Sequence, residues 1–547
     1  MGMTRIAVVG VGPRGLAVLE RVLAWARTGR FAVTVDLYEP AEHLGVGIHG
    51  TDQPEYLLLN TVCAQLTAFS DAEMVGDAPT TTGPNLFEWA RAHGVRVDGP
   101  DGPRAVRWDD HLPRATLGEY LRWAAGTLLE DLPAGVEVRH VRRAVREVRP
   151  ALHGGRVVLD DEVRDADLVV VTTGHGLAGP EHPYPLPDAL EEIAPGARVA
   201  VVGTGLTAMD AIAALTVGRG GRHVRAADGT TAYVASGAEP HLVLVNRTGW
   251  LPCARPVPQE GRRPDEPRFM REDQLRRVAH GSSGLDLRRD VEPLVEAEMV
   301  HVAGESAPDV LRVLHPPTSW PDASSYRAAV RRRAVHDLRE ARRGLGSSSY
   351  KRALEVLRDQ RDFLRSAVDA GLSGASRTDF FGRFAATVNR CVIGPQKERI
   401  EELLALFDAG VATMAPGPDP AVVRSGDRWA LESRRLELPE RVEVDVVLRC
   451  TSSWPSDDPE RDPVVARLRT GTGLEPGRWV SRDGAVVGPD GRATAVVVLG
   501  PPCEGVSYYN HYVPSPGSSS RALLDIDRVL ATHLPAVPAA VASERPE

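Results

Sequence analysis

The sequence contains almost no lysine and carries no excess of positive charge. Lys351 and Lys397 are the only lysines among 65 Lys and Arg residues, and the formal net charge of the 547-residue chain is −9. A mildly acidic chain has no general attraction for nucleic acid or for anionic membranes, so we expect neither as a partner. The preference for arginine, together with abundant alanine, glycine and valine, indicates a GC-rich bacterial genome.

Long hydrophobic runs are also missing. No stretch approaches the roughly 20 consecutive apolar residues of a membrane-spanning helix. The apolar run at residues 6–11 leads into a glycine turn and not into a signal-peptide cleavage site. We therefore expect a cytoplasmic protein.

Cysteine is scarce and scattered. The chain has five cysteines, Cys63, Cys253, Cys391, Cys450 and Cys503. Their spacing lacks the close pairs of a zinc site and the CxxC arrangement of a redox dithiol. We expect no metal site, and we expect each cysteine to be a small buried apolar residue.

The length and composition indicate a multidomain globular protein. The chain is 42% hydrophobic and 25% charged, which is an ordinary globular balance and excludes a disordered chain or a small disulfide scaffold. At roughly 100–200 residues per domain, the length suggests about two to four domains or one elaborated two-domain enzyme.

The N-terminal segment has the pattern of a dinucleotide-binding unit. A strand at 5–9 is followed by a GxGxxG turn and a helix at 16–27, and a second strand at 31–38 ends in a carboxylate. Glycines permit a tight turn close to a pyrophosphate, and a carboxylate at the end of the second strand can bind ribose hydroxyls. The alternative is a turn that only packs a helix on a sheet. The candidate cofactor-binding residues are Gly10, Gly12, Pro13, Arg14, Gly15 and Glu39.

A second copy of this pattern begins at residue 198. A strand at 198–202 leads into a glycine turn and a helix, and the next strand ends in arginine instead of an acid. Arg247 at this strand end can pair with a ribose 2′-phosphate, which favours NADPH over NADH. Arg222 is a rival phosphate ligand, and a surface arginine without a ligand is the alternative. The other cofactor-binding candidates here are Gly203, Thr204, Gly205 and Thr207.

The repetition extends beyond the two turns. Residues 135–174 and 410–452 each predict a three-stranded excursion followed by a buried strand, the first of which ends near Gly174, another cofactor-binding candidate. Apolar strands of this kind are typical of a parallel sheet covered on both faces. The sequence therefore predicts an α/β fold with two Rossmann-like dinucleotide-binding domains and, at about 261–395, an arginine-rich helical insertion.

Two such units in this order resemble the glutathione-reductase-like, two-domain fold of class B flavin monooxygenases and related bacterial FAD/NAD(P)-binding flavoproteins. These include flavin-containing monooxygenases, Baeyer–Villiger monooxygenases and amino-acid N-hydroxylases. The resemblance implies FAD in a first domain at 1–194, NADPH in a second domain at 195–450, and a return segment at 451–547 that completes the FAD site. It adds Gly500 and Pro501, in a terminal glycine turn, as cofactor-binding residues.

The same resemblance suggests residues near the reaction. The segment at 59–71 is similar to a flavin-containing monooxygenase segment in which an asparagine precedes Phe-Ser-Asp, here residues 69–71. This implies that Asn60, the catalytic candidate, and Thr61 lie against the flavin; the alternative for Asn60 is an ordinary turn residue. The candidate substrate-binding residues are His111 and Arg114, which precede a predicted helix, and Asn389 and Lys397 in the insertion.

The resemblance implies an FAD- and NADPH-dependent monooxygenase. A flavin hydroperoxide would transfer one atom of molecular oxygen to a small-molecule substrate, and the flavin would carry the chemistry. The Baeyer–Villiger fingerprint is only loosely present, around Gly174-His175 and residues 183–185, so we expect N-hydroxylation of an amine or small amino acid. The alternatives are a reductase that passes electrons to a small molecule or partner and a non-catalytic FAD/NAD(P)-binding protein. The sequence does not determine the oligomeric state.

Overall fold

The chain forms two compact units, one made of Met1–Leu177 and Ser453–Glu547 and the other of Ala178–Ser452. The computed structural model describes residues 3–29, 32–99, 102–176, 182–225, 229–281, 284–369, 371–451, 462–474, 478–534 and 537. The first unit is thus built from both ends of the chain. Residues 182–194, expected in the first domain, group with the second unit, where Arg219 donates a hydrogen bond to the Leu190 carbonyl at 2.9 Å.

The first unit is organised around a six-stranded sheet in the order β19-β20-β9-β1-β2-β5. The strands are β1 (Thr4–Val9), β2 (Val33–Tyr38), β5 (Val136–Val141), β9 (Leu168–Val171), β19 (Ala485–Val487) and β20 (Ala493–Val498). Neighbours pair in parallel except β19, which is antiparallel to β20. Ile6 and Val8 enter the core on one face, and Ala7 and Val9 enter the core on the other. The sheet is therefore buried on both faces.

Helices cover one face of this sheet, and a small second sheet with a helix covers the other. The first layer contains η1 (Cys63–Gln65), α2 (Ala72–Val75) and the longer helices α1 (Pro13–Ala26), α3 (Leu86–Ala92), α4 (Arg114–Glu130) and α16 (Arg521–His533). The opposite layer contains β6 (Glu147–Pro150), β7 (Gly155–Val158), β8 (Val163–Ala166) and α15 (Pro463–Thr472). The remaining short elements are β3 (Arg96–Val97), β4 (Arg104–Ala105) and η7 (Pro501–Cys503).

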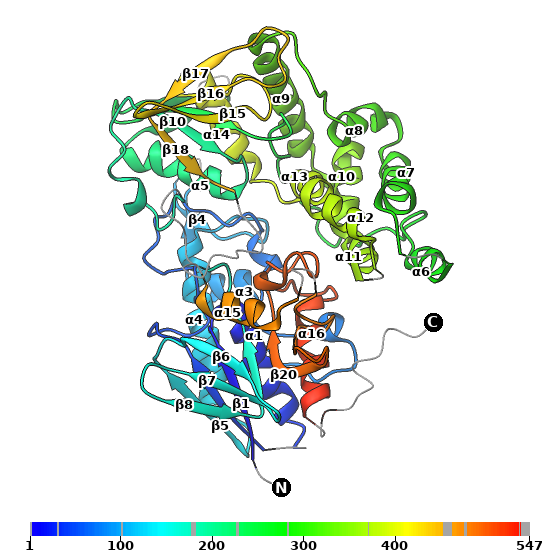
Figure 1. Ribbon diagram of the computed structural model, residues 1–547. Helices are drawn as coiled ribbons and strands as arrows, with labels where there is room; N and C mark the ends of the chain where they lie inside the picture. Colours follow the sequence, from blue (N-terminus) through cyan, green and yellow to red (C-terminus); the bar gives the residue numbers. More distant parts are fainter. Residues whose placement is uncertain are drawn as a thin grey trace. The chain divides into compact units, whose positions relative to one another are not determined.

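A buried ionic network joins α1 to α16, the blue and red helices that lie side by side in Figure 1. Arg21 Nε and Trp25 Nε1 each donate to Asp527 Oδ1 at 2.8 Å. Arg21 also donates to Ser70 at 2.9 Å, and Ser70 donates to Glu20 at 2.7 Å. Burial raises the pKa of both Glu20 and Asp527. The network holds together residues from opposite ends of the chain.

The second unit repeats the plan with a parallel four-stranded sheet in the order β14-β13-β10-β18. Its strands are β10 (Arg198–Val202), β13 (His241–Val245), β14 (Ala412–Met414) and β18 (Val446–Arg449), and α5 (Leu206–Leu215) follows β10. An antiparallel sheet of β15 (Ala421–Ser425), β16 (Arg428–Glu432) and β17 (Arg441–Val444) precedes β18 as β6–β8 precede β9. This repetition confirms the predicted fold class. The smaller elements are η2 (Asp188–Leu190), η3 (Val217–Arg219), β11 (Arg222–Arg225) and β12 (Thr231–Val234).

A helical insertion separates β13 from β14, and its helices are drawn in green and yellow-green in Figure 1. Its elements are α6 (Glu272–Gly281), η4 (Leu287–Val291), α7 (Glu292–Ala303), η5 (Gly304–Ser306), α8 (Ala307–Leu314), α9 (Ala323–Ser347), α10 (Ser349–Asp359), α11 (Arg361–Asp369), α12 (Gly374–Asp379), η6 (Phe380–Phe384), α13 (Ala385–Val392) and α14 (Lys397–Asp408). Among the described helices, none combines the length and hydropathy that a membrane span requires.

Removal of Asp527 should destabilise the first unit strongly. Asp527→Ala removes the nearer of the two buried carboxylates beside Arg21, at 2.8 Å, and leaves Glu20 at 3.6 Å. This loss from a buried ion pair costs about 3–5 kcal/mol of unfolding free energy. Urea denaturation followed by tryptophan fluorescence measures this change. Asp131→Ala is the matched control, because this carboxylate pairs with Arg27 at the end of the same helix but is 88% exposed. The control should lose less than about 1 kcal/mol, and equal losses would contradict the role assigned to the buried network.

Candidate cofactor sites and the residues around them

The first glycine turn joins β1 to α1 and has no room for side chains. Gly10 has a φ of +83°, and a Cβ there would lie 2.9 Å from the Cα of Thr173. A Cβ on Gly15 would lie 2.5 Å from the carbonyl oxygen of Gly10. At Gly12 a Cβ would lie 3.3 Å from the Cα of Gly47. The backbone of this turn is therefore open to close approach by a ligand.

The N-terminus of α1 has the features of an anion-binding site. Gly12 is the N-cap, Pro13 follows it, no side chain caps the helix, and the first turn contains no acid. The N–H donors and the partial positive charge of the helix end thus face outward. Glu39, after β2, accepts hydrogen bonds from the backbone N–H groups of Val11 at 2.9 Å and Ala41 at 3.1 Å. A carboxylate beside an uncapped helix N-terminus fits the ribose and pyrophosphate of FAD.

The neighbouring strand ends bring further predicted residues to the same edge of the sheet. β20 and β9 run parallel to β1, so Gly174 after β9 and Gly500 after β20 follow strand ends on that side. A Cβ on Gly500 would lie 3.4 Å from the Arg14 side chain. Arg14 donates to the Asn510 carbonyl at 2.8 Å, and Pro501 begins the turn η7 that leads there. The return segment therefore contacts the first glycine turn.

The structure also brings Asn60, Thr61, His111 and Arg114 together. His111 Nδ1 lies 3.0 Å from the carbonyl oxygen of the residue before Asn60. The Arg114 N–H donates to the Leu57 carbonyl at 2.7 Å. Asn60 and Thr61 directly follow the residues that make these contacts, and both are half-buried. The four candidates thus belong to one region of the first unit.

A polar cluster after β20 was missed by the sequence reasoning. Glu504 accepts hydrogen bonds from the N–H groups of Tyr509 at 3.2 Å and Asn510 at 3.0 Å, and lies 3.8 Å from His511. Burial raises the pKa of Glu504, but these partners outweigh it and hold the pKa below its usual range. Burial, with the nearby charge of His511, lowers the pKa of His175 to about 4. The spacing of these residues in the sequence does not predict the cluster, because His175 follows β9 and the other residues follow β20.

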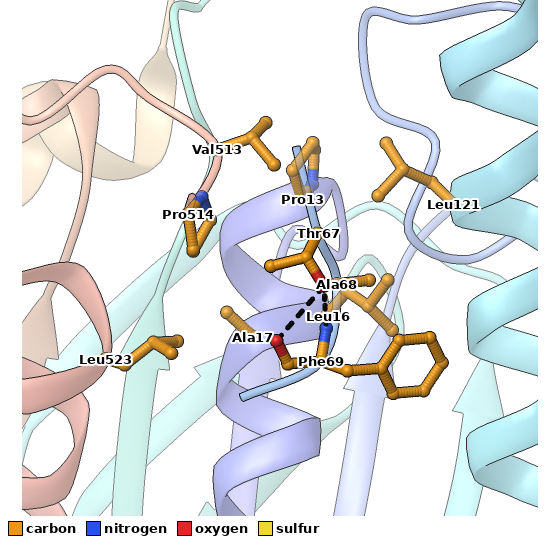
Figure 2. A pocket seen from close by; sticks show the side chains of 10 residues that line it. All are labelled: Pro13, Leu16, Ala17, Thr67, Ala68, Phe69, Leu121, Val513, Pro514 and Leu523. Carbon is orange, nitrogen blue, oxygen red and sulfur yellow. Dashed lines mark hydrogen bonds between the residues drawn. The ribbon is translucent and has the colours of Figure 1, made fainter. Parts of the chain in front are cut away.

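A small apolar hollow of about 10 Å³, the space of about one water molecule, lies beside the first turn of α1 (Figure 2). Thr67 closes a small turn there: its hydroxyl donates to the Phe69 carbonyl at 3.1 Å and accepts from the Phe69 N–H at 3.0 Å. Apart from Thr67 the lining is apolar, so the hollow is a packing gap in the apolar interior beside this turn. The lining residues are Pro13, Leu16, Ala17, Thr67, Ala68, Phe69, Leu121, Val513, Pro514 and Leu523.

The second glycine turn has the same character. Gly203 has a φ of +106°, and a Cβ there would lie 2.8 Å from the carbonyl oxygen of Cys450. Gly205 is the N-cap of α5, which has no side-chain cap and no acid in the first turn, where Thr207 lies. Thr204 accepts a hydrogen bond from Asn246 at 3.3 Å. These residues fit a second dinucleotide.

The end of β13 presents an arginine and an organising amide. Arg247 is exposed and donates to the Gly382 carbonyl at 3.4 Å, and Arg222 is exposed on β11. Asn246, which the sequence reasoning missed, accepts from the Gly249 N–H at 2.7 Å and donates to the Trp250 carbonyl at 3.1 Å. Asn246 directly follows β13 and precedes a turn that contains Gly249. This sequence pattern could have identified it.

The two substrate candidates of the insertion differ in their surroundings. Lys397, at the start of α14, forms an ion pair with Glu398 at 2.7 Å. Asn389, on α13, has a buried Oδ1 without a hydrogen-bond partner among the described residues. The next residue, Arg390, was not a sequence candidate. Two of its buried guanidinium nitrogens have no partner among the described residues, whereas Asn389 has one such atom.

Arg390 and Arg333 form a buried cationic site. Arg390 is 7% exposed and donates to the Val313 carbonyl at 2.6 Å, but its Nε and Nη1 have no partner among the described residues. Arg333 donates to the Leu251 carbonyl and to the Cys253 sulfur, both at 3.0 Å, while its buried Nε has no such partner. Burial lowers the pKa of Arg390, and the charge of Arg333 lowers it further. Buried guanidinium groups with unused donors favour an anion, and a carboxylate matches their geometry.

Comparisons with known proteins show what the chain is similar to. Residues 7–176 match a family described as FAD-NAD(P)-binding. The chain is 30% identical to the nitrosuccinate-forming L-aspartate N-monooxygenase of Streptomyces davaonensis over 97% of both chains. It is also 30% identical to the nitrosuccinic acid synthase of Aspergillus oryzae, over 97% of this chain and 93% of that protein. A solved ornithine hydroxylase from Pseudomonas aeruginosa is 14% identical, with a TM-score of 0.47 over 98% of this chain and all of that one.

Gly12→Val should prevent retention of FAD. A Cβ at this position already approaches Gly47, and the rest of the valine side chain would cover the N–H donors of α1. We expect FAD affinity to fall by at least roughly tenfold, equivalent to about 1.4 kcal/mol. The ratio of flavin to protein absorbance after purification and reconstitution measures it. Gly126→Val is the control, because a Cβ there, on α4, meets nothing within 4 Å; a Gly12→Val protein that holds FAD as tightly as the control would contradict the assignment.

Proposed function

The chain belongs to the family of FAD- and NADPH-dependent amino-acid N-monooxygenases, and we propose that its substrate is L-aspartate. The observation that carries the proposal is the similarity to L-aspartate N-monooxygenases over 97% of this chain. Because the relatives are named for nitrosuccinate, the proposal includes repeated oxidation of the amino nitrogen to a nitro group. Each round inserts oxygen from dioxygen at the expense of NADPH.

The buried cations of the insertion support a dicarboxylate substrate. L-Aspartate carries two carboxylates, and Arg390 and Arg333 each have a guanidinium donor that no described residue accepts. Arg390 is the better candidate, because two of its nitrogens lack a partner and only one donates to a carbonyl. In our proposal these guanidiniums bind the carboxylates and leave the amine to be oriented for reaction, while Asn389, beside Arg390, supplies a buried amide oxygen.

The residues of the first unit are assigned to FAD. The turn Gly10–Gly15 and the N-terminus of α1 would hold the pyrophosphate, and Glu39 would hold the ribose. The apolar side chains that line the small hollow at Pro13 and Phe69 would keep water away from this end of α1. Bound FAD takes electrons from NADPH and activates dioxygen. The Asn60 amide makes no hydrogen bond to another described residue, so it can donate to groups that gain negative charge in the reaction.

The second unit is assigned to NADPH. Gly203, Gly205 and the N-terminus of α5 would hold its pyrophosphate, with Thr204 oriented by Asn246. Arg247 would bind the 2′-phosphate because it is exposed at the end of β13, where the ribose of a dinucleotide lies in this fold. Its hydrogen bond to the Gly382 carbonyl is long and weak at 3.4 Å.

Turnover with L-aspartate tests the proposed function. The FAD-loaded enzyme should oxidise NADPH faster with L-aspartate than without it, and the product nitrogen should carry oxygen from isotopically labelled dioxygen, read by mass spectrometry. Arg390→Gln should raise the KM for L-aspartate by roughly ten- to a hundredfold, since a charged hydrogen bond is worth about 1.5–3 kcal/mol. Arg331→Gln is the control, because Arg331 lies on the same helix as Arg333 but pairs with Asp408 at the surface.

Two results would contradict this proposal. If NADPH oxidation in the presence of L-aspartate and other amino acids yields only hydrogen peroxide, the proposed N-oxygenation of amino acids is wrong. If the Arg390→Gln enzyme has an unchanged KM for L-aspartate and an unchanged product, Arg390 does not bind the substrate carboxylate. The proposed reaction would still stand.

Arg247→Ala should reduce the preference for NADPH over NADH. Loss of the contact to the 2′-phosphate should raise the KM for NADPH by roughly ten- to a hundredfold, equivalent to about 1.5–3 kcal/mol, and leave that for NADH nearly unchanged. Steady-state oxidation of both cofactors measures the ratio. Arg222→Ala is the matched variant on β11, and a selective loss in that variant alone would assign the phosphate contact to Arg222 instead.

A further inference from the structure

Glu504 is a buried carboxylate that organises the loop after β20. The residue is 7% exposed. Its Oε1 accepts a hydrogen bond from the Tyr509 N–H at 3.2 Å. Its Oε2 accepts two hydrogen bonds from Asn510, one from the backbone N–H and one from Nδ2, both at 3.0 Å. Burial raises the pKa of Glu504, but the charge of His511 and these donors outweigh burial, so the carboxylate is charged. One buried anion therefore accepts three hydrogen bonds from the loop.

The backbone of Tyr509, in this loop, adopts a conformation that its side chain disfavours. Its φ is +64°, in the left-handed region, which a bulky residue adopts only where its surroundings enforce it. The hydrogen bonds from Tyr509 and Asn510 to Glu504 lie at this turn. Ser507 adds a constraint, because its hydroxyl donates to Asn510 Oδ1 at 3.1 Å and its carbonyl accepts from Asn510 Nδ2 at 3.2 Å. Strained turns of this kind cluster at functional sites.

The turn directs one backbone carbonyl at the first glycine turn. The Asn510 carbonyl accepts a hydrogen bond from Arg14 Nη2 at 2.8 Å, and Arg14 is the second residue of α1. The Arg14 guanidinium also lies over the ring of Tyr512, 5.6 Å from its centre. The Tyr512 hydroxyl accepts from the Ala522 N–H at 2.8 Å, at the start of α16. Arg14 is thus held at the helix end to which the FAD pyrophosphate is assigned.

The same segment continues to the part of the first unit that contains Asn60. The Pro514 carbonyl accepts a hydrogen bond from the Thr67 N–H at 3.0 Å. The Ser515 hydroxyl donates to the Gln65 carbonyl at 2.8 Å. The loop that Glu504 organises therefore connects the first glycine turn with the segment after Asn60.

We propose that Glu504 is a positioning residue for FAD. Its carboxylate holds the left-handed turn at Tyr509, the turn holds the Asn510 carbonyl, and this carbonyl fixes the Arg14 guanidinium for a phosphate of the cofactor. Glu504 thus acts on FAD through Arg14. The proposal rests on the assignment of FAD to the first glycine turn, and it gives a residue that the sequence reasoning missed a role in FAD retention.

Retention of FAD by the full-length holoenzyme tests the proposal. The FAD-loaded enzyme is diluted in steps, free flavin is separated by ultrafiltration, and the Kd for FAD follows from the free fraction. Glu504→Gln keeps the size of the side chain, but it removes the charge and places an amide N–H2 group among the donors. The Kd should rise by roughly tenfold, as expected when a charge-assisted hydrogen bond is lost. Arg14→Gln should raise the Kd by at least the same factor.

A double variant separates positioning from a merely structural role. If Glu504 acts through Arg14, the enzyme with both Glu504→Gln and Arg14→Gln should hold FAD no more weakly than Arg14→Gln alone. Two independent effects would instead multiply, and that result would overturn the proposal. If Glu504→Gln fails to fold, Glu504→Asp, which keeps the charge but shortens the side chain, takes its place in the same comparison.

Glu239→Gln is the matched control. Glu239 is 8% exposed in the second unit, and it accepts hydrogen bonds from the N–H groups of Ser236 at 2.7 Å and Gly237 at 2.8 Å. Its substitution should leave the Kd for FAD unchanged, and a rise equal to that of Glu504→Gln would overturn the proposal.

The remaining outcomes distinguish this inference from the assignments on which it rests. An unchanged Kd for FAD in Glu504→Gln or in Arg14→Gln, together with loss of FAD in Gly12→Val, would overturn the role of Glu504 and leave the FAD site in place. Retention of FAD by all three variants would overturn the site as well. No amino acid is present in these measurements, so none of the results depends on the L-aspartate proposal.

Discussion

The first unit depends on a buried guanidinium that joins the two ends of the chain. Arg21 on α1 is fully buried, and its bond to Asp527 spans 506 residues of sequence. Asp527 is the nearer of the two carboxylates beside this buried cation, since Glu20 of α1 itself lies at 3.6 Å, so the docking of α16 stabilises the packing of α1. That docking also brings the loop after β20 to the first glycine turn, where Arg14 contacts Asn510. One ionic contact thus couples the stability of the unit to the completeness of its cofactor site.

Parallel strands explain why both candidate cofactor sites lie where they do. Strands that pair in parallel end at the same edge of the sheet, and in each unit a glycine turn at that edge leads into a helix whose N-terminus has no side-chain cap. The unused N–H donors and the helix dipole favour a pyrophosphate at both positions. The units differ in the residue at the end of the second strand: Glu39 suits ribose hydroxyls, and Arg247 suits a phosphate.

The insertion is distinguished by buried charge. Lys351 and Asp337 neutralise each other, but Arg390 faces only a carbonyl oxygen, and Arg333 faces a carbonyl oxygen and a thiol sulfur. Buried guanidinium donors without an acceptor favour the binding of an anion. In our proposal a substrate carboxylate fills that need at Arg390.

The sequence by itself determined the two strand, glycine turn and helix units, the repeated excursions and the glycine positions of both sites. These features are local: φ values of +83° at Gly10 and +106° at Gly203 favour glycine, and strand and helix periodicities involve neighbouring residues. Only the tertiary structure decided which distant side chains meet. It brought Arg21 to Asp527, 506 residues away, and left Arg390 with unused donors. No spacing rule predicts such contacts, because the partner of a buried polar group is chosen by the packing of whole elements and not by its neighbours in the chain.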